Sequence, residues 1–576
     1  MYKINQVPDI TDISYASIDL EMFGQDKDRL HQPHGTFACL SVVLGNFAQS
    51  ISRSYLISDV TMLQQTMDTL QGVPIWVFQN ATYDIIQLGG LCDVQPDGLP
   101  LHYIWDTMLV EKILYSGYYV NFSLKDLARR YLGKLLAKDK YEDIADRTID
   151  TKALYDYAID DALDTRDVFL KQHPLLYTSP ALKRIYDEVD APMVWVVANL
   201  QPVRIDVSRW LEFAKINKAK ADSIELEIGV NTMSPKQVKE RLLTLGINVE
   251  STGDEILAEY AGNHFVDKVR EARMYRTAVS KYGDKWIEKH VVNGLVKAGF
   301  NVTGALTGRM SSDNPNLQNI PSRKMPVFRE FFITNMGTMI VADVSQQEPR
   351  ITALLSNDPT LVSVFNNKED IHSTITKLIF GLDEVDKHDP RRKIGKEIGL
   401  GMAYGLSAEG LRSNLKEKAP ELFENGKDLT VSECQAFIDK YFKKFPAVKT
   451  ALDQIVKNGF KNEYVSSPAG RKIHINIHAN GWERGCMNYP HQSGGVDMLK
   501  VWCRFILDET RARGIPFGMS MLIHDEVVMD VKTELLDVYK EILGIAFDKA
   551  IDLLLPNSPV PFVYEVGTGE SWACKE

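Results

Sequence analysis

The stretch TMIVADVSQQEPR, residues 338–350, predicts a buried strand that ends at Asp343 and is followed by a helix. A carboxylate at the end of a buried run costs free energy unless a metal ion or a cation meets it. Asp343 is therefore a candidate functional residue, although an ordinary turn acid would produce the same pattern.

A second acid lies 182 positions further along the chain, at Asp525. His524, Asp525 and Glu526 stand between the apolar runs 519–523 and 527–529, the pattern of a tight hairpin with Asp525 at its tip. Only the tertiary fold could bring this acid to Asp343. Two unrelated turn acids would be the simpler interpretation if no other signal accompanied them.

A third signal is a helical stripe in RRKIGKEIGLGMAYG, residues 391–405. Basic, apolar and aromatic residues recur there at intervals of four and so share one helix face. They are Arg392, Lys396, Leu400 and Tyr404. Such a gradient suits a nucleoside triphosphate, with phosphates at the basic end and sugar and base at the other. A charged face that grades into the core would look similar.

Glycines interrupt the same stretch at positions 395, 399 and 401. Each disfavours a helix interior by roughly 0.5–1 kcal/mol relative to alanine. We hypothesise that this helix is mobile and closes over substrate.

Near the N-terminus, Asp19 and Glu21 in SIDLEM stand two apart in a predicted strand and so share one face. Two such carboxylates can hold a divalent metal, but a solvated strand face is the commoner origin of this pattern. Two further pairs strengthen the signal. They are Asn80 with Asp84 after the apolar run PIWVF, and Tyr157 with Asp161 in the helical YAIDDALD.

Together, four acids from a strand, a strand end and a helix could bind two metals about 4 Å apart. That arrangement activates a water and stabilises the leaving oxygen in phosphodiester hydrolysis. Tyr157, one helical turn before Asp161, could orient the water.

The composition is that of a globular protein, with 44% hydrophobic and 25% charged residues among 576. A length of this kind predicts roughly three to five folding units. The net charge of −11 does not exclude nucleic acid, because the local potential of a cleft matters more than the sum. The six cysteines form no CxxC pair, which favours a reducing cytoplasm. With no signal peptide and no apolar run of about 18 residues, we expect no membrane association.

Along the chain, the first 175 residues alternate β-rich runs (37–44, 74–78) with helical patterns (124–131, 155–170), which predicts an α/β region with a mixed sheet. HPLLYTSP, residues 173–180, contains two prolines and predicts a boundary. Residues 181–296 are mostly helical, and strand and helix signals mix beyond them. The fold class is therefore α/β and α+β, in several domains.

The ordered motifs resemble those of the family A DNA polymerases, the type of bacterial DNA polymerase I and many bacteriophage replicases. The resemblance extends from Asp19 to near Trp572. Residues 343–350, 391–405 and 524–526 are similar to motifs A, B and C, and the Asp19 set resembles the three motifs of DnaQ-like 3′–5′ exonucleases. Further matches are TGRMSSDNPNLQNIP (307–321), ERGCMNYPHQSGG (483–495) and the thumb segment NTMSPKQV (231–238).

The resemblance implies a ribonuclease H-like 3′–5′ exonuclease domain at 1–175 and a right-hand polymerase domain at 181–576. Within the latter it implies a thumb at about 187–300, a palm at about 301–355 and 480–576, and fingers at about 356–479. It also implies template-directed DNA synthesis with proofreading, on primer-template DNA and dNTPs.

By the same resemblance, two Mg²⁺ ions, for which Mn²⁺ could substitute, would act at each site. Their ligands would be Asp343, Val344 through its carbonyl, and Asp525 at one site, and Asp19, Glu21, Asp84 and Asp161 at the other. The implied catalytic set also includes Lys396, Glu526 and Tyr157. The implied nucleotide-binding residues are Val344, Gln346, Glu348, His372, Arg392, Lys396, Leu400 and Tyr404. The implied contacts to the primer terminus or the minor groove are Arg309, Asn319, Arg484, Asn488, Gln492 and His524.

Several residues depart from the family pattern. Val344 replaces a tyrosine, and Gln347 and Pro349 replace isoleucine and leucine; proline is acceptable in the first turn of a helix. Leu400 stands where relatives carry Phe or Tyr against the incoming sugar. Leucine has no hydroxyl to replace a missing 3′-OH, which predicts discrimination against dideoxynucleotides.

The alternatives are a nuclease whose C-terminal half only binds DNA, and a non-catalytic replication scaffold. The intact Asp343, Lys396 and Asp525 disfavour the nuclease, and the two intact carboxylate sets together disfavour the scaffold. Because the exonuclease motif begins at Asp19 and the thumb segment is short, we expect a monomeric phage replication enzyme without a 5′-nuclease domain. It would act in the bacterial or phage-infected cytosol, with helicase, primase or single-stranded DNA-binding protein as further candidate partners.

Overall fold

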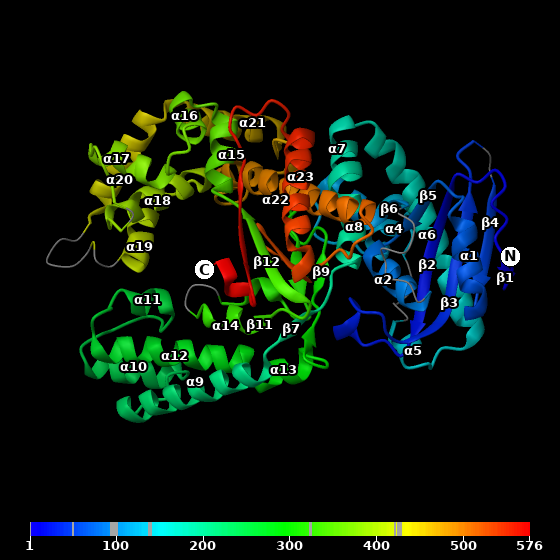
Figure 1. Cartoon of the computed structure of the whole chain (residues 1–576), viewed down its shortest axis with the longest axis horizontal. Coiled ribbons are helices and arrows are strands. Elements are labelled where there is room, and N and C mark those ends of the chain that lie inside the picture. The colour runs from blue at the N-terminus through cyan, green and yellow to red at the C-terminus, as the bar shows by residue number, and fades with distance from the viewer. Residues whose placement is uncertain are drawn as a thin grey trace.

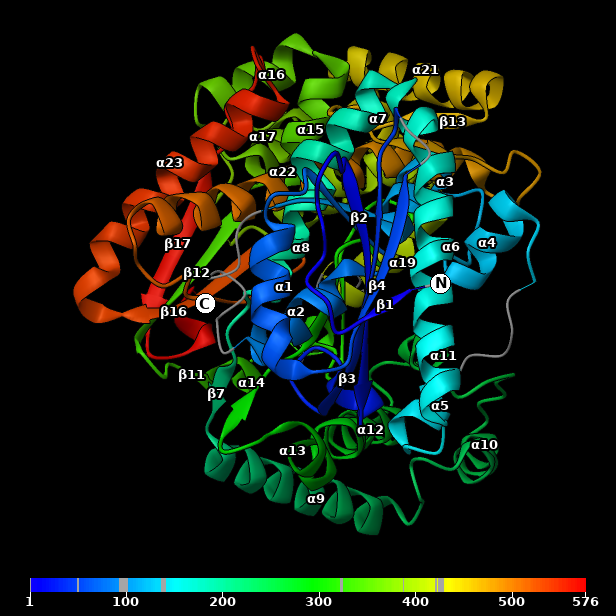
Figure 2. The same ribbon diagram turned by 90° about the vertical axis from the view of Figure 1, so that its right-hand side faces the viewer.

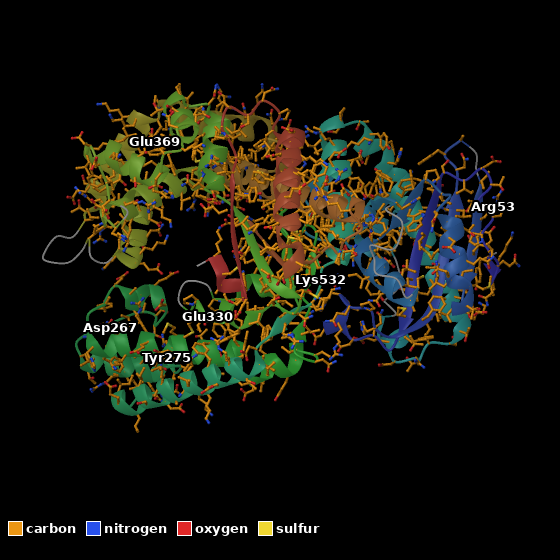
Figure 3. All side chains as sticks on the ribbon, viewed as in Figure 1. Arg53, Asp267, Tyr275, Glu330, Glu369 and Lys532 are labelled. Carbon is orange, nitrogen blue, oxygen red and sulfur yellow. The ribbon has the colours of Figure 1, made fainter. Side chains whose placement is uncertain are left out.

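The computed structural model describes residues 2–48, 51–92, 102–135, 141–321, 325–386, 388–419, 422 and 429–575. An N-terminal sheet occupies one end of the long axis, and two groups of helices lie above and below a central sheet toward the other end (Figure 1). Arg53 and Asp267 mark these opposite ends (Figure 3).

The N-terminal sheet is mixed, as the alternating pattern predicts. Its strand order is β1-β4-β3-β2-β5-β6, with β5 and β6 parallel to β2 and β3 antiparallel to it. The strands are β1 (Lys3–Ile4), β2 (Tyr15–Phe23), β3 (Thr36–Gly45), β4 (Ser52–Ile57), β5 (Ile75–Phe78) and β6 (Tyr103–Asp106).

Helices cover both faces of this sheet. α6 lies on one side, whereas α1 and α2 lie on the other (Figure 2). The helices are α1 (Leu63–Leu70), α2 (Ala81–Leu91), α3 (Thr107–Tyr115), α4 (Leu124–Leu132), α5 (Tyr141–Ala145) and α6 (Thr151–Tyr177).

The break between helices predicted at residues 173–180 covers only residues 178–179. α6 continues through Pro174 to Tyr177, and α7 begins at Pro180. Packing outweighs the hydrogen bond that proline lacks, because Leu176 is fully buried and Gln172 donates to the Thr107 carbonyl at 3.0 Å. α7 (Pro180–Ile185), a π turn (Tyr186–Asp190) and α8 (Ala191–Ala198) then connect to the central sheet.

A projecting pair of long helices follows, in the part of the chain that was predicted to be mostly helical, residues 181–296. α9 (Val207–Ile228) packs along α12 (His264–Tyr282), and α10 (Pro235–Thr244), α11 (Asp254–Ala258) and α13 (Asp284–His290) complete the group. Trp210 anchors its base by stacking on Trp286 at a centroid distance of 4.5 Å. The short strands β7 (Val203–Ile205), β8 (Leu295–Val296) and β11 (Phe332–Ile333) form a small sheet beside α14 (Val327–Glu330).

The central sheet is antiparallel, with strand order β15-β16-β12-β17. Its strands are β12 (Gly337–Val344), β15 (Met519–Ile523), β16 (Glu526–Lys532) and β17 (Tyr564–Gly569). α22 (Trp482–Ala512) and α23 (Leu536–Leu554) pack beside it around the fully buried Trp502. The hairpin of β9 (Gly299–Asn301) and β10 (Ser311–Asp313) lies toward the N-terminal sheet.

The upper helices form their own core. They are α15 (Gln347–Ser356), α16 (Pro359–Asn366), α17 (Ile371–Phe380), α18 (Arg391–Gly401), α19 (Ala408–Lys418), α20 (Val431–Lys444) and α21 (Pro446–Asn462). The hairpin of β13 (Tyr464–Ser466) and β14 (Lys472–His474) follows α21. Among the described residues, no helix is both long and apolar enough to cross a bilayer.

Candidate active sites

The first site lies at one end of the central sheet, where Asp343 and Asp525 meet. Asp343 on β12 pairs in register with Glu526 on β16, and Asp525 immediately precedes Glu526 in a two-residue turn. His524, with a φ of 59°, makes that turn possible. Both acids line one cavity of about 450 Å³. The chain thus brings together two acids 182 positions apart.

Oxygen donors of the kind that Mg²⁺ prefers converge in this cavity. Burial raises the pKa of Asp525, and the ammonium of Lys575 contacts Asp343. Lys575 Nζ also lies 3.7 Å from Glu565 Oε2 on β17. A cation held between two carboxylates is consistent with a site suited to positive charge. Within the described ranges, no three His, Cys, Asp or Glu side chains already have the arrangement of a metal centre.

Glu348 forms the opposite wall of the cavity, at the start of α15. The Tyr404 hydroxyl donates to its carboxylate, and Arg309 lies 3.7 Å away. Burial raises the pKa of Glu348, and the amide of Gln492 donates to the Tyr404 hydroxyl. These contacts join three segments distant in sequence. Pro349 stands in the first turn of α15, as predicted, and Gln346 precedes that helix with a φ of 52°.

The helical stripe is only partly one helix. α18 ends at Gly401, and Tyr404 lies on a following 3₁₀ turn, so the regular spacing of four breaks before the aromatic residue. Leu400 lines the cavity, whereas Lys396 is exposed. Arg392 donates to both carboxylate oxygens of Asp370 at 3.0 Å. Arg392 and Lys396 still precede Leu400 along α18, and Leu400 lines the cavity.

His372 lies on α17, behind the stripe. Burial lowers the pKa of its imidazole to about 4, and its Nδ1 has no hydrogen-bond partner among the described residues. The three glycines of α18 have a packing reason. A Cβ at Gly395 would stand 2.2 Å from Thr376 Oγ1, so this glycine lets α18 approach α17 closely. The mobility of α18 stays a prediction.

Glu526 is placed differently from Asp525. Its carboxylate accepts hydrogen bonds from the Trp572 indole and, at 3.3 Å, from Arg329. It is buried and does not line the cavity. Its predicted catalytic role therefore lacks a contact with the cavity in this structure.

Five of the six predicted DNA contacts line the same cavity or lie on α22. Arg309, Gln492 and His524 line it. Asn319 lies on a 3₁₀ turn, and its carbonyl accepts from the Tyr282 hydroxyl at 2.5 Å. Arg484 is exposed on α22, and Asn488 Oδ1 is buried without a partner among the described residues.

The second site lies on the N-terminal sheet. β2 carries Asp19 and Glu21, the first turn of α2 carries Asp84, and α6 carries Asp161. Burial and then the charge of Asp161 raise the pKa of Asp19, and burial and then Asp19 raise the pKa of Asp84. One strand and two helices thus bring their acids to one place, with Asp84 in the first turn of α2 and not at the strand end.

Tyr157 lies one turn before Asp161 on α6, and its hydroxyl hydrogen-bonds that carboxylate. Burial, followed by Asp161 and Glu21, raises the pKa of Tyr157. Asp19 Oδ2 is buried with no hydrogen-bond partner in the described part of the chain. An unsatisfied buried carboxylate oxygen among acids fits a bound cation.

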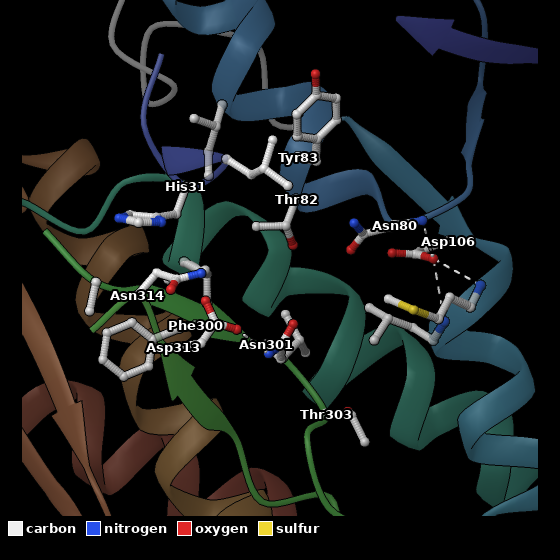
Figure 4. Close-up of a pocket in the computed structure, with 18 of the residues that line it drawn as sticks. His31, Asn80, Thr82, Tyr83, Asp106, Phe300, Asn301, Thr303, Asp313 and Asn314 are labelled. Carbon is white, nitrogen blue, oxygen red and sulfur yellow. Dashed lines mark hydrogen bonds between the residues drawn. The ribbon is translucent and has the colours of Figure 1, made fainter. Parts of the chain in front are cut away.

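Asn80 lies at the edge of a separate cavity of about 220 Å³, between α2 and the β9–β10 hairpin. Figure 4 shows Asn80, Thr82 and Tyr83 on one side and Asn301 and Asp313 on the other. Burial lowers the pKa of Lys297, which also lines it, to about 8.

Three further charged residues near these sites were not predicted from the sequence: Asp106, Glu565 and Lys575. Asp106 accepts from the Ala81 and Met108 amides and so caps both α2 and α3. It follows the buried run YIW, the same signal that singled out Asp343. Glu565 and Lys575 have no such signal, because only the pairing of β17 with β12 brings them to Asp343.

Two family models match the chain. The model of DNA polymerase family A matches residues 211–574, and a 3′-5′ exonuclease model matches residues 15–176. The chain belongs to DNA polymerase family A. The resemblance on which the sequence analysis rested is thereby confirmed, as is the order of an exonuclease domain followed by a polymerase domain. Such polymerase and exonuclease domains are generally metal-dependent.

Bacterial enzymes named DNA polymerase I are among the relatives of this family A chain. That of Caldicellulosiruptor bescii is 29% identical over 416 residues, or 67% of this chain and 47% of the relative. That of Pseudomonas aeruginosa is 29% identical over 510 residues (81% and 53%), and that of Aquifex aeolicus 27% over 489 (79% and 82%). The chain thus spans about half the length of the first two.

A solved structure shares the fold. It is the POL domain of Pol1 from M. smegmatis in complex with DNA primer-template and dNTP. The superposition covers 100% of both chains with a TM-score of 0.81 at 23% sequence identity. The fold class predicted from the sequence, an exonuclease domain before a polymerase domain of mixed α and β structure, is confirmed.

Proposed function

We propose that this protein is a template-directed DNA polymerase that adds dNTPs to a primer 3′ end and proofreads with a 3′–5′ exonuclease. The single observation that carries this proposal is the convergence of Asp343 and Asp525 in one cavity with Leu400 and Glu348. A platform that only binds DNA would not need two convergent acids.

At the polymerase site, Asp343, Asp525 and the Val344 carbonyl would hold two Mg²⁺ ions, with Mn²⁺ as a substitute. When bound there, such ions would lower the charge barrier for attack of the primer 3′-hydroxyl on the α-phosphate. Lys396 and Arg392 bind the triphosphate, and Arg392 exchanges Asp370 for phosphate oxygens as it does so. Leu400 packs on the sugar, and Glu348, held by Tyr404, blocks a 2′-hydroxyl.

At the exonuclease site, Asp19, Glu21, Asp84 and Asp161 would hold the metal ions that activate water. Tyr157 orients that water through its hydroxyl, next to Asp161. The unsatisfied Asp19 Oδ2 supports this assignment.

We also propose the division into exonuclease (1–175), thumb, palm and fingers as stated above, and primer-template DNA and dNTPs as substrates. A monomer acting in the cytoplasm fits these substrates. Action in bacteriophage replication, with helicase, primase or single-stranded DNA-binding protein as partners, stays a prediction, since the three relatives named above are bacterial enzymes.

A primer-extension gel tests the proposal. We expect template-dependent lengthening with dNTPs and shortening without them. Asp343→Ala should abolish lengthening only, and Asp19→Ala with Glu21→Ala should abolish shortening only. Asp552→Ala, an exposed acid on α23, is the matched control and should retain both. Shortening without any lengthening would support the nuclease alternative, and no change at all would support the scaffold.

A further inference from the structure

Five side chains form a surface that neither active site uses, where the loop after α3 meets the β13–β14 hairpin. We call it the aromatic platform, and it consists of Tyr118, Tyr119, Tyr464, Lys472 and His474. The His474 amide donates to the Ser116 carbonyl at 2.8 Å, which fixes the loop to the hairpin. α4, next to this loop, and β13 lie on the same side of the molecule (Figure 2).

The rings of the platform form a connected row. Tyr118 makes edge-to-face contacts with Tyr119 at 5.0 Å and with His474 at 5.8 Å. His474 in turn contacts Tyr464 at 6.3 Å. Tyr118 nevertheless keeps 67% of its surface exposed. One exposed tyrosine is ordinary, but a row from two distant segments is not.

Strand alternation places the hairpin residues of the platform outward. Val465 and Ile473 point inward and pack near Cys486 of α22, so Tyr464, Lys472 and His474 share the outer face. Lys472 Nζ lies 4.1 Å from the centroid of the Tyr464 ring. On the loop side, the Arg130 guanidinium lies 4.2 Å from the Tyr119 ring. Cations therefore flank the row at both ends.

The β13–β14 hairpin and the proposed template region both contact the N-terminal part of α22. Arg484 opens the same N-terminal part of α22 on which the hairpin packs, and a Cβ at Gly405, next to Tyr404, would stand 3.0 Å from its side chain. Trp482, two residues before Arg484 on α22, contacts Phe460, which is 58% exposed. An unpaired strand that leaves Tyr404 and passes Arg484 would therefore come to the β13–β14 hairpin, which carries three of the platform residues.

We propose that the aromatic platform binds the single-stranded 5′ overhang of the template ahead of the polymerase site. Unpaired bases stack on aromatic rings whatever their sequence, and flanking cations attract the phosphates. Duplex DNA offers no unstacked base, so the platform discriminates for single strands. This inference rests on the proposed polymerase function and deepens it.

The test compares the affinity for primer-templates with overhangs of about 2 and about 15 nucleotides, measured by fluorescence anisotropy on the full chain. Wild-type protein should bind the long overhang more tightly. In the double variant Tyr118→Leu with Lys472→Gln, affinity for the long overhang should fall by about tenfold. Its affinity for the short overhang should stay unchanged. Tyr118→Phe should behave as wild type, since stacking needs the ring and not the hydroxyl.

The matched control is Phe505→Leu, on the other half of α22, combined with Lys549→Gln on α23. Lys549 lies 5.9 Å from the Phe505 ring, and Phe505 stands 21 residues beyond Arg484, about 30 Å along the helix. It should retain the full gain. An unchanged gain in the platform variant, or an equal loss in the control, would overturn the inference.

A second DNA substrate tests whether the platform binds the template strand or the non-template strand. A forked DNA with a 5′ flap on the non-template strand should bind equally well to wild type and to the platform variant. If the platform variant lost affinity only for the forked DNA with the flap, the assignment to the template strand would be overturned. Normal extension on short overhangs with an unchanged overhang dependence would reject the platform alone, whereas no DNA binding or extension by wild type would reject the polymerase function itself.

Discussion

In the proposed function, Leu400 is the side chain that would contact the sugar of the incoming nucleotide. It lines the cavity with Asp343 and Asp525, and it offers only methyl groups. Leu400→Tyr would add a hydroxyl that can replace the missing 3′-OH of a dideoxynucleotide. We expect about a tenfold or greater rise in the ratio of ddNTP to dNTP incorporation, since one hydrogen bond contributes about 1–3 kcal/mol.

The ratio is measured by competitive primer extension. Leu406→Tyr, on the loop beyond the 3₁₀ turn, does not line the cavity and serves as the control. Equal dideoxy incorporation by Leu400→Tyr and wild type would refute the placement of Leu400 at the sugar.

His491 on α22 couples stability to pH. Its Nδ1 donates to the Met487 carbonyl at 2.7 Å, and its Nε2 is buried without a partner among the described residues. Burial lowers the pKa of His491 from 6.5 to about 4. The unfolded chain therefore binds this proton at higher pH than the folded one, so the stability that the neutral ring contributes is present above pH 6.5 and lost toward pH 4.

The expected loss from this group is about 3 kcal/mol, one pKa unit corresponding to about 1.4 kcal/mol. Urea unfolding at several pH values between these limits measures it. His491→Gln removes the titration, so its free energy of unfolding should fall less steeply with acidification than that of wild type. Parallel curves for the two proteins would contradict the prediction.

At the scale of elements, the approach of α18 to α17 depends on Gly395. A Cβ there would stand 2.2 Å from Thr376 Oγ1 and 2.7 Å from the His372 carbonyl, so the helices would have to separate. We expect Gly395→Ala to lower the free energy of unfolding by about 1–3 kcal/mol and to weaken dNTP binding, because Arg392 and Lys396 move with α18.

Gly410→Ala on α19 is the matched control. Its Cβ would meet the end of the flexible Leu406 side chain at 3.1 Å and Ser407 Oγ at 3.5 Å, an ordinary van der Waals distance. Alanine favours a helix over glycine by about 1 kcal/mol, so this variant should be neutral or slightly stabilised in urea unfolding. A destabilisation equal to that of Gly395→Ala would show that close approach is not the cause.

At the scale of the whole molecule, a buried ion-pair network joins the connection between the two domains to the polymerase. Arg471, just before β14, donates to Asp190 of the π turn at 2.8 and 2.9 Å and to Asp497 of α22 at 2.8 Å. Lys500 donates to Asp190 at 2.6 Å. Burial alone would raise the pKa of Asp190, but Arg471 and Lys500 lower it to about 2.

Arg471→Met would leave buried carboxylates with only Lys500 as a counter-charge. We expect a loss of about 3–5 kcal/mol in the free energy of unfolding, measured with urea or heat. Arg513→Met breaks a more exposed pair, with Glu541 at 2.9 Å, and should cost less than about 1 kcal/mol. Similar losses in both variants would contradict the role of the network.

The sequence by itself determined the family, the order of the two domains and the local geometry of the acids. Asp343 at a strand end, Asp525 in a tight turn, and Tyr157 one turn before Asp161 were all predicted, because hydrophobic periodicity and turn residues act over a few positions. It also predicted the mixed N-terminal sheet and Pro349 in a first helical turn.

Only the tertiary structure decided what depends on distant partners. Packing of Leu176 and Gln172 carried α6 past Pro174, and the turn after Gly401 ended α18 before Tyr404. Strand pairing brought Lys575 and Glu565 to Asp343 and turned Glu526 toward Trp572. Sequence spacing does not encode such contacts, because burial and electrostatics act through space and not along the chain.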